Sequence, residues 1–157
     1  MPLELDRHDL QLLALVQDDA QRPLSQLAQT VHLSTAAVHR RLKRLTDAGV
    51  IQSTRAQVQP AAVGYPLSII VAVEVESERV DLLDAMKRSF AAQPEVQQCY
   101  YVTGESDFIL ILTVRDMAHY TQLTRQLFFT NNNVRKFKTF VTMSPVKVGL
   151  GVPITPD

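Results

Sequence analysis

The sequence lacks several features that would indicate a disulfide-bonded, membrane or metal-binding protein. Cys99 is the only cysteine, so the chain can form no internal disulfide and no cysteine-based metal site. No apolar run reaches the roughly 18 residues of a membrane-spanning helix, and Met1 to Asp6 lack the basic and apolar blocks of a signal peptide. There is also no paired acid and base, nucleophile elbow or metal-ligand spacing. We therefore expect a cytoplasmic protein without a membrane partner, without a cofactor and without enzymatic activity.

The overall charge is balanced, with 16 basic and 16 acidic residues, and gives no support to a nucleic-acid partner. The local balance differs. Residues 38–55 carry five Lys or Arg side chains against the single acid Asp47, while residues 74–84 carry five acids against Arg79. A short basic element in a neutral protein predicts contact with phosphates. A passive solvated helix face is the alternative interpretation.

The first 59 residues show three short stretches with apolar residues at helical spacing. Asp6 is a good N-cap for the first stretch, and Ser34 caps the third after a tight turn at Leu33. Gly49 stands where a left-handed helix stop belongs. Residues 50–51 and 55–58 are expected to form short strands, which makes residues 1–59 a winged helix-turn-helix. The expected inward positions are Leu10, Leu13 and Val16, then Leu24, Leu27 and Val31, then Val38, Leu42 and Leu45.

The periodicity changes after a hinge at residues 60–66, which contains Pro60, Gly64 and Pro66. Residues 67–148 then alternate between strand-like and helix-like patterns in the order β-α-β-β-α-β, which predicts a ferredoxin-like domain and an α+β fold. The remaining residues 149–157 are expected to form a flexible or arm-like tail. The expected strands are 67–75, 96–102, 108–114 and 134–143. The expected helices are 77–92, with Val80, Leu83, Met86 and Phe90 inward, and one capped by Asp116, with Met117, Tyr120, Leu123 and Leu127 inward.

One of these strands is apolar on both faces. Phe108, Leu110 and Leu112 point to one side, while Ile109 and Ile111 point to the other. Two helices can cover only one face of a four-stranded sheet, so a second copy of the sheet is the simplest cover for the other face. The pattern therefore predicts a two-fold dimer.

The third helix has the features of a DNA reader. Its face opposite the apolar side carries Ala36, Arg40, Lys43 and Asp47. Because a recognition helix enters the major groove N-terminus first, its early residues are expected at base edges and its later basic residues at phosphates. The expected base contacts are Thr35, Ala36, His39 and Arg40; the expected phosphate contacts are Arg41, Arg44 and Arg55; Ser34 and Lys43 complete the predicted double-stranded DNA interface.

The order and spacing of several motifs resemble the Lrp/AsnC family of transcriptional regulators over nearly the whole chain. The motifs are Leu5-Asp6-Arg7-x-Asp9-x-x-Leu12-Leu13, Leu27-Ala28, Leu33-Ser34, Val38-x-x-Arg41-x-x-x-Leu45-x-x-x-Gly49-x-Ile51, Gly64-Tyr65 and Val102-Thr103-Gly104-Glu105-Ser106-Asp107-Phe108. The resemblance implies sequence-specific regulation of amino-acid-related metabolism. It also implies a dimer through the C-terminal domain that assembles into tetramers or octamers, with an amino-acid effector bound between dimers.

Carried onto this chain, the resemblance places the effector near the loop between the second and third strands. The residues agree with that placement, because Gly104 lets backbone N–H groups approach a carboxylate and Asp107 can accept an ammonium group. An ordinary glycine-containing hairpin is the alternative. Phe128 or Phe129, in the aromatic stretch 127–134, would favour an apolar effector such as leucine or methionine. The implied effector residues are Tyr100, Tyr101, Val102, Thr103, Gly104, Glu105, Ser106, Asp107 and Phe129.

Two other functions stay open at this point. One is an architectural DNA-binding protein without an effector. The other is an enzyme, because some sirohaem decarboxylases resemble this family in fold; that chemistry needs histidine and arginine around a large tetrapyrrole. His119 is isolated on the last helix, and the other histidines, His8, His32 and His39, lie in the DNA-binding half.

Overall fold

The computed structural model describes residues 3–131 and 133–156, so Met1, Pro2, Asn132 and Asp157 lie outside the described residues. The chain folds as two compact units. One contains the residues up to Gln57 together with those from Lys147 onward, and the other is Val58–Val146. The C-terminal segment, which we expected to be a flexible or arm-like tail at residues 149–157, is thus grouped with the helical unit from Lys147 onward.

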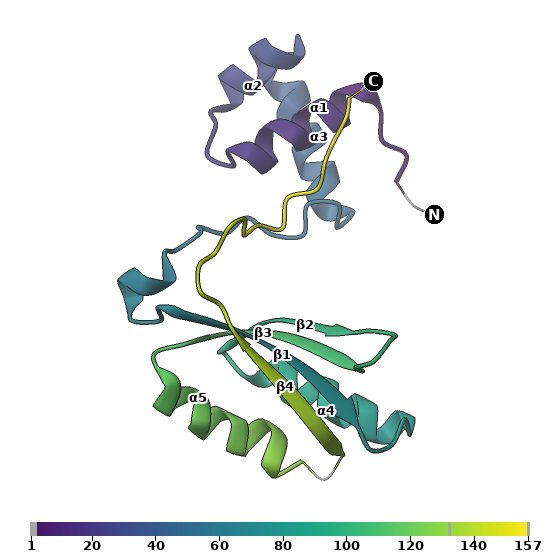
Figure 1. Ribbon diagram of the computed structural model, residues 1–157. Coiled ribbons are helices and arrows are strands. Elements are labelled where there is room, and N and C mark those ends of the chain that lie inside the picture. The colour runs from purple at the N-terminus through teal and green to yellow at the C-terminus, as the bar shows by residue number, and fades with distance from the viewer. Residues whose placement is uncertain (1–2, 132, 157) are drawn as a thin grey trace. The chain divides into compact units, whose positions relative to one another are not determined.

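The helical unit consists of α1 (Arg7–Asp18), α2 (Leu24–Val31) and α3 (Thr35–Asp47), as Figure 1 shows. The predicted caps are confirmed. Asp6 and Asp9 form a reciprocal capping box at the start of α1, and the Ser34 side chain accepts a hydrogen bond of 3.1 Å from the backbone N–H of Ala37. Gly49, with φ +73°, follows α3 in the left-handed conformation that we expected there.

The core of this unit comes from one face of each helix. Leu12 of α1, Leu27 of α2 and Val38 of α3 are all buried and pack together. The chain turns between α2 and α3 at His32, whose φ of 55° is left-handed, and Leu33 follows it. The helix-turn-helix arrangement is thus fixed by apolar packing on one side and by a tight backbone turn.

The strands that we expected after α3 do not form. Residues 50–59 lie in no strand of the described structure. The backbone N–H groups of Val50 and Ile51 instead donate to the Leu45 carbonyl at 2.9 and 3.2 Å, which satisfies the C-terminal end of α3. These two donors are therefore not available for pairing between strands, and residues 50–59 have no partner strand in the described part of the chain. The predicted strands of the wing were wrong.

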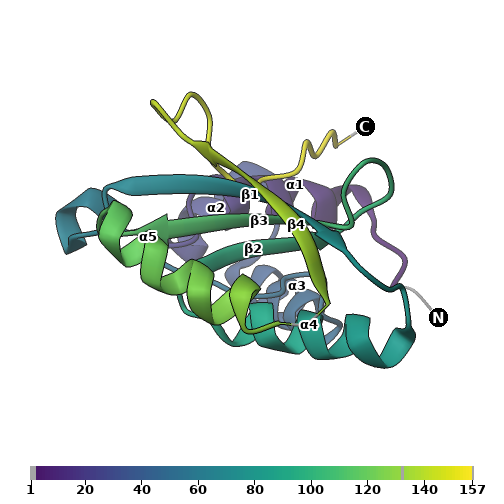
Figure 2. The same cartoon turned by 60° about the horizontal axis from the view of Figure 1, so that its bottom comes forward.

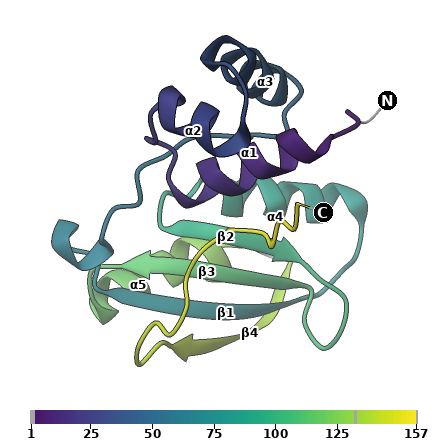
Figure 3. The ribbon, with the colours of Figure 1, turned by 90° about the horizontal axis from the view of Figure 1, so that it is seen from above.

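The segment that we expected to be a hinge contains η1 (Pro60–Val63), a short 3-10 turn, and Gly64 ends it with φ +85°. The second unit continues with a four-stranded antiparallel sheet in the order β2-β3-β1-β4, which Figure 3 views face on. The order β-α-β-β-α-β along the chain confirms the ferredoxin-like prediction. The elements are β1 (Leu67–Val75), α4 (Val80–Ala92), β2 (Val96–Tyr101), β3 (Phe108–Val114), α5 (Met117–Thr124), η2 (Arg125–Phe129) and β4 (Val134–Val141).

Both helices cover the same face of the sheet (Figure 2). Alternate residues of the two central strands point into that layer, and Val71 and Leu110 are fully buried there. The ring of Phe90 on α4 packs edge-on against Phe108 with centroids 5.4 Å apart. Val80, which we expected inward, is instead 72% exposed, because α4 begins at Val80 and its first side chain lies before the covered part of the helix. Met117 is also exposed at the start of α5.

The other face of the sheet has no cover within the described unit. Its side chains include Ile70, Tyr100 and Phe140, which are 37, 48 and 54% exposed, and the half-buried Ile109 and Ile111. The two-sided apolar pattern of β3 is therefore present as predicted. No helix among the described residues is long and apolar enough to cross a membrane.

Candidate DNA interface and effector loop

The N-terminal part of α3 presents the residues that we expected at base edges. Thr35, Ala36, His39 and Arg40 are all exposed, as is Ser34. Beneath them, Val38 and Leu45 are fully buried and hold the helix against the other two. The same apolar residues that define the core thus fix which side of α3 meets solvent.

Arg41 and Arg44 reach toward α1, although the Arg44 side chain is still 46% exposed. Arg41 Nη1 lies 2.7 Å from Asp6 Oδ2 and 2.8 Å from Asp9 Oδ1, and Arg44 Nη2 pairs with the other Asp9 oxygen. The Asp9 side chain is fully buried, and its carboxylate is paired with these two guanidinium groups and also accepts a hydrogen bond from the backbone N–H of Asp6. The two arginines therefore tie the recognition helix to the start of α1.

The pKa values of this network follow its contacts. Hydrogen bonds to Asp9 and then Asp6 raise the pKa of the Arg41 guanidinium above its ordinary value. The backbone N–H of Asp9 lowers the pKa of the Asp6 carboxyl, and Arg41 lowers it further. The ion pair between Asp6 and Arg41 therefore stays charged across the neutral pH range.

The other basic residues of the predicted DNA interface differ in whether they form ion pairs within the protein. Lys43 Nζ pairs with Asp47 Oδ2 at 2.8 Å on the exposed helix surface. Among the described residues Arg40 forms no ion pair, and Arg55 is exposed in the segment after α3. A hollow of about 310 Å³ lies beside Arg40. Its lining residues are Asp6, Leu33, Ala37, Arg40, Arg41 and Arg44.

The loop between β2 and β3 is held by Asp107. Its backbone N–H donates to the Val73 carbonyl at 2.8 Å, and its Oδ2 accepts a 2.7 Å hydrogen bond from the N–H of Val75. One carboxylate oxygen of Asp107 therefore fixes the end of β1. Gly104 has φ +134°, which a residue with a Cβ rarely adopts. The tip residues Thr103, Gly104 and Glu105 are exposed, and Val102 and Ser106 are half-buried.

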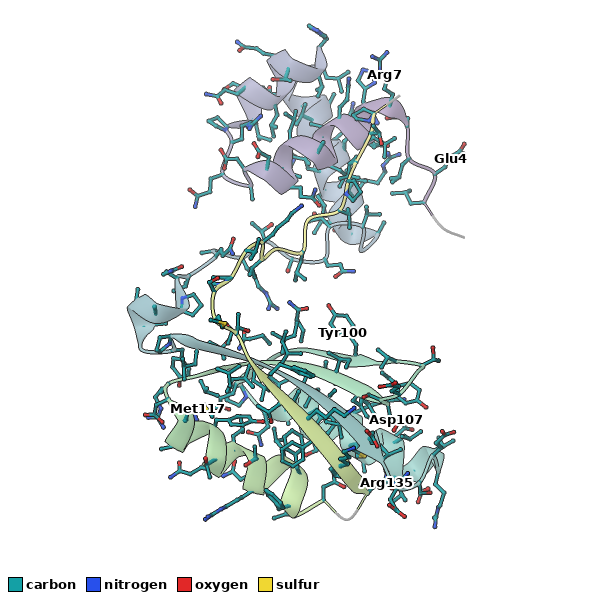
Figure 4. All side chains as sticks on the ribbon, in the orientation of Figure 1. Glu4, Arg7, Tyr100, Asp107, Met117 and Arg135 are labelled. Atoms are coloured by element: carbon teal, nitrogen blue, oxygen red, sulfur yellow. The ribbon has the colours of Figure 1, made fainter. Side chains whose placement is uncertain are left out.

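The aromatic residues that we associated with an effector do not lie together. Tyr100 projects from the sheet face that the helices leave open (Figure 4), where its hydroxyl bonds Gln98 at 2.7 Å. Tyr101 lies on the helix-covered face, with its ring 5.1 Å from that of Phe108. Phe129 is 71% exposed at the end of η2, whereas Phe128 is buried in the core. Of these two phenylalanines, only Phe129 is available to a ligand.

His119 is less isolated than the sequence indicates. Its Nε2 lies 3.2 Å from Glu95 Oε1, and its Nδ1 accepts hydrogen bonds of 3.3 Å from the backbone N–H and the Nε of Arg115. Both ring nitrogens are thus occupied within the unit. Among residues 3–131 and 133–156, no three His, Cys, Asp or Glu side chains gather as metal ligands would.

Sequence reasoning missed the role of Asp9. The pattern Asp6-x-x-Asp9 before an apolar run is the signature of a capping box and could have indicated that both carboxylates have local partners. Nothing in the sequence pairs Asp9 with Arg41 and Arg44, which follow it by more than thirty residues.

Comparison with known proteins agrees with this two-unit architecture. A family model described as the winged helix-turn-helix DNA-binding domain matches residues 5–52, and one described as the Lrp/AsnC ligand binding domain matches residues 68–151. An uncharacterized HTH-type transcriptional regulator of Sinorhizobium fredii is 46% identical over 97% of this chain and 90% of its own length. A leucine-responsive regulatory protein of Rhizobium meliloti is 31% identical over 97% of each chain.

Solved structures are similar as well. A transcriptional regulator of Neisseria meningitidis in complex with L-Met superposes with a TM-score of 0.88 at 25% identity, over 96% of this chain and 97% of that one. The fold and the site thus define a helix-turn-helix transcriptional regulator with a ligand-binding domain. The chain belongs to the Lrp/AsnC family.

Proposed function

We propose that α3 reads the operator through Thr35, Ala36, His39 and Arg40, while Lys43 and Arg55 meet phosphates. The exposed Arg40, beside arginines already engaged by α1, is the observation that carries this assignment. Arg is the side chain that most often pairs with guanine in the major groove. Arg41 and Arg44 can also contact a phosphate, but only with the part of each guanidinium group that is not already paired with Asp6 or Asp9.

The proposed effector is an amino acid that binds at the loop from Val102 to Asp107. The relatives support this, since one is named leucine-responsive and another was solved with L-Met. The second oxygen of Asp107 is the proposed acceptor for the ammonium group, and the exposed N–H groups around Gly104 are the proposed donors to the carboxylate. The exposed ring of Phe129 favours an apolar side chain on the effector.

The proposed assembly is a dimer that buries the open sheet face, stacking further into tetramers or octamers. The support is the partly exposed row of Ile70, Tyr100 and Phe140 on that face. In a dimer of dimers, the effector loops of neighbouring subunits would complete one another's sites.

The proposed role is regulation rather than catalysis, in the cytoplasm where the DNA lies. Both ring nitrogens of His119 have partners, which leaves a sirohaem decarboxylase no open histidine in this unit. An absorption spectrum without a Soret band, and no loss of added sirohaem, are the expected results for the purified protein.

The direct test of the whole proposal is capture of genomic DNA fragments by the purified full-length chain, followed by sequencing, with and without a mixture of amino acids. We expect a small set of enriched sites with a shared motif and a change in occupancy when the mixture is added. Uniform coverage that ignores amino acids would instead support the architectural function. Catalysis of sirohaem decarboxylation would overturn the proposal.

A further inference from the structure

The segment from Val146 to Val152 has the sequence of a strand but lies in no sheet. It reads Val-Lys-Val-Gly-Leu-Gly-Val, with apolar residues at every second position. Val146, Val148, Leu150 and Val152 are 97, 67, 77 and 59% exposed. Because alternate side chains of an extended chain share a face, the three that follow the bend at Val146, namely Val148, Leu150 and Val152, would form one exposed apolar strip. Such a strip beside open backbone groups is a site for pairing with another strand.

One edge of this segment is already occupied within the helical unit. The Gln17 side chain on α1 acts as a short strand partner: its Nε2 donates to the Val152 carbonyl at 2.7 Å and its Oε1 accepts from the Val152 N–H at 3.0 Å. The two bonds mimic the exchange that a residue makes in an antiparallel pair. They fix Val152 against α1, and residues 147–152 lie in no helix or strand (Figure 1).

The other edge is open. In an extended chain both backbone groups of a residue point to one edge, and those of the next residue point to the other. With residues 147–152 in that extended form, the groups of Lys147, Gly149 and Gly151 would face away from the edge that Gln17 occupies. Within the described part of the chain, none of the backbone hydrogen bonds outside helices and strands involves these three residues.

The segment is also self-complementary about Gly149. If two copies run antiparallel with Gly149 opposite Gly149, then Val148 stands opposite Leu150 and Lys147 stands opposite Gly151. Every hydrogen-bonded position then lies on the open edge, and both apolar strips lie on one face of the ribbon. We propose that residues 147–151 pair with the same segment of a second copy of this chain, across a two-fold axis at Gly149.

The pairing joins helical units rather than sheets. The residues from Lys147 onward fold with α1, α2 and α3, so a ribbon between two tails links the DNA-binding units of two subunits directly. The consequence rests on the proposed DNA-binding function: a fixed link between two recognition helices sets the spacing of two operator half-sites. An isolated two-stranded ribbon is marginal in water, so the pairing depends on a dimer that already holds the tails at high local concentration.

Cysteine cross-linking of the full-length chain tests the register. In a Cys99→Ser background, Gly149→Cys is expected to form a covalent dimer on mild oxidation. Directly opposite Cα atoms in such a pair lie about 5.5 Å apart, within the range of a disulfide. An added Cβ at Gly149 meets nothing within 4 Å, so the substitution fits the fold.

Neighbouring positions provide the matched controls. Lys147→Cys alone is expected not to cross-link, because the two copies of that position lie four residues, roughly 14 Å, apart along the ribbon. A mixture of Lys147→Cys and Gly151→Cys chains, whose cysteines stand opposite one another, is expected to cross-link although neither does so alone.

Three outcomes would overturn the pairing. One is no Gly149→Cys cross-link under conditions where light scattering shows a dimer. The second is equal cross-linking of Lys147→Cys and Gly149→Cys. The third is a cross-link from Gly149→Cys to an Ile111→Cys chain in preference to itself, which would place the tail on the open sheet face of the second copy. If the dimer does not cross-link but still retards operator DNA, only the pairing of residues 147–151 is refuted. If the dimer cross-links but binds no DNA, the pairing stands and the proposed DNA-binding function is refuted.

Discussion

The buried carboxylate of Asp9 and the guanidinium of Arg41, 2.8 Å apart, connect the first helix of the DNA-binding unit to its recognition helix. Arg44 pairs with the same carboxylate from one turn further along α3. Arg41 and Arg44, which the sequence predicts as phosphate contacts, therefore stabilise the helical unit. They set the orientation of the helix whose outer face carries Arg40.

Replacement of Asp9 is expected to destabilise the helical unit strongly. Asp9→Asn removes the charge that Arg41 and Arg44 share but leaves two partly exposed arginines rather than a buried charge, so the expected cost is that of weakened charge-assisted hydrogen bonds, about 2 kcal/mol. Urea unfolding followed by circular dichroism would measure the loss. As a control, Asp47→Asn removes the partner of Lys43 from an exposed pair and should change the unfolding free energy by less than about 1 kcal/mol. Equal effects of the two variants would contradict the account.

The stability of the same unit should fall in acid through Asp6. Its pKa lies below the ordinary value of 3.8, chiefly because the carboxylate accepts the N–H of Asp9. A carboxyl with a lowered folded pKa adds stability that is complete above the unfolded pKa and is lost as the pH falls through the folded one. We therefore expect the urea concentration at the unfolding midpoint to decrease as the pH is lowered below about 4.

Asp6→Asn separates the charge of Asp6 from its capping role, since asparagine keeps the oxygen that caps α1. The variant should show a smaller loss of stability between pH 5 and pH 3 than the natural chain. Identical pH profiles for the two proteins would show that Asp6 does not contribute in this range.

Asp107 is expected to have two separable roles. Asp107→Asn retains an oxygen for the Val75 N–H but removes the charge proposed to bind an ammonium group, so the fold should persist while the effector response is lost. Asp107→Ala should in addition cost about 1 kcal/mol, because the Val75 donor loses its partner. Thermal-shift titration with each of the twenty amino acids would distinguish them. A full response of Asp107→Asn to leucine or methionine would refute the ammonium assignment.

The open sheet face should control assembly. Ile111→Asp places a charge among the apolar residues of that face and is expected to give a monomer by size-exclusion chromatography with light scattering. Val80→Asp, at a side chain that is already 72% exposed, should leave the oligomer unchanged. A dimer that survives Ile111→Asp would mean that another surface holds the subunits together.

Much of this architecture could be predicted from the sequence, because it depends on local patterns. The bounds of β1 and β3 follow from their apolar runs, and the caps at Asp6, Ser34 and Asp116 follow from residue type and position. The strands expected at residues 50–51 and 55–58 do not form, because a strand needs a partner and partners are not visible in a local stretch of sequence.

The positions of the functional residues were likewise predictable where they depend on local sequence and not where they depend on contacts between distant residues. The exposed position of Arg40 follows from helical periodicity around Val38 and Leu45. Periodicity alone could not show that Arg41 turns back toward Asp9, since that contact joins distant parts of the chain. The bonds between Gln17 and Val152, 135 residues apart, were beyond prediction for the same reason.

The central claim is that the outer face of α3 reads DNA, and one residue tests it most directly. Gel retardation of an operator fragment from the genomic capture should be abolished by Arg40→Ala, while light scattering shows an unchanged oligomer. Arg88→Ala, which removes an exposed arginine from α4, should bind the fragment normally. Unaltered sequence-specific retardation by Arg40→Ala would contradict the account.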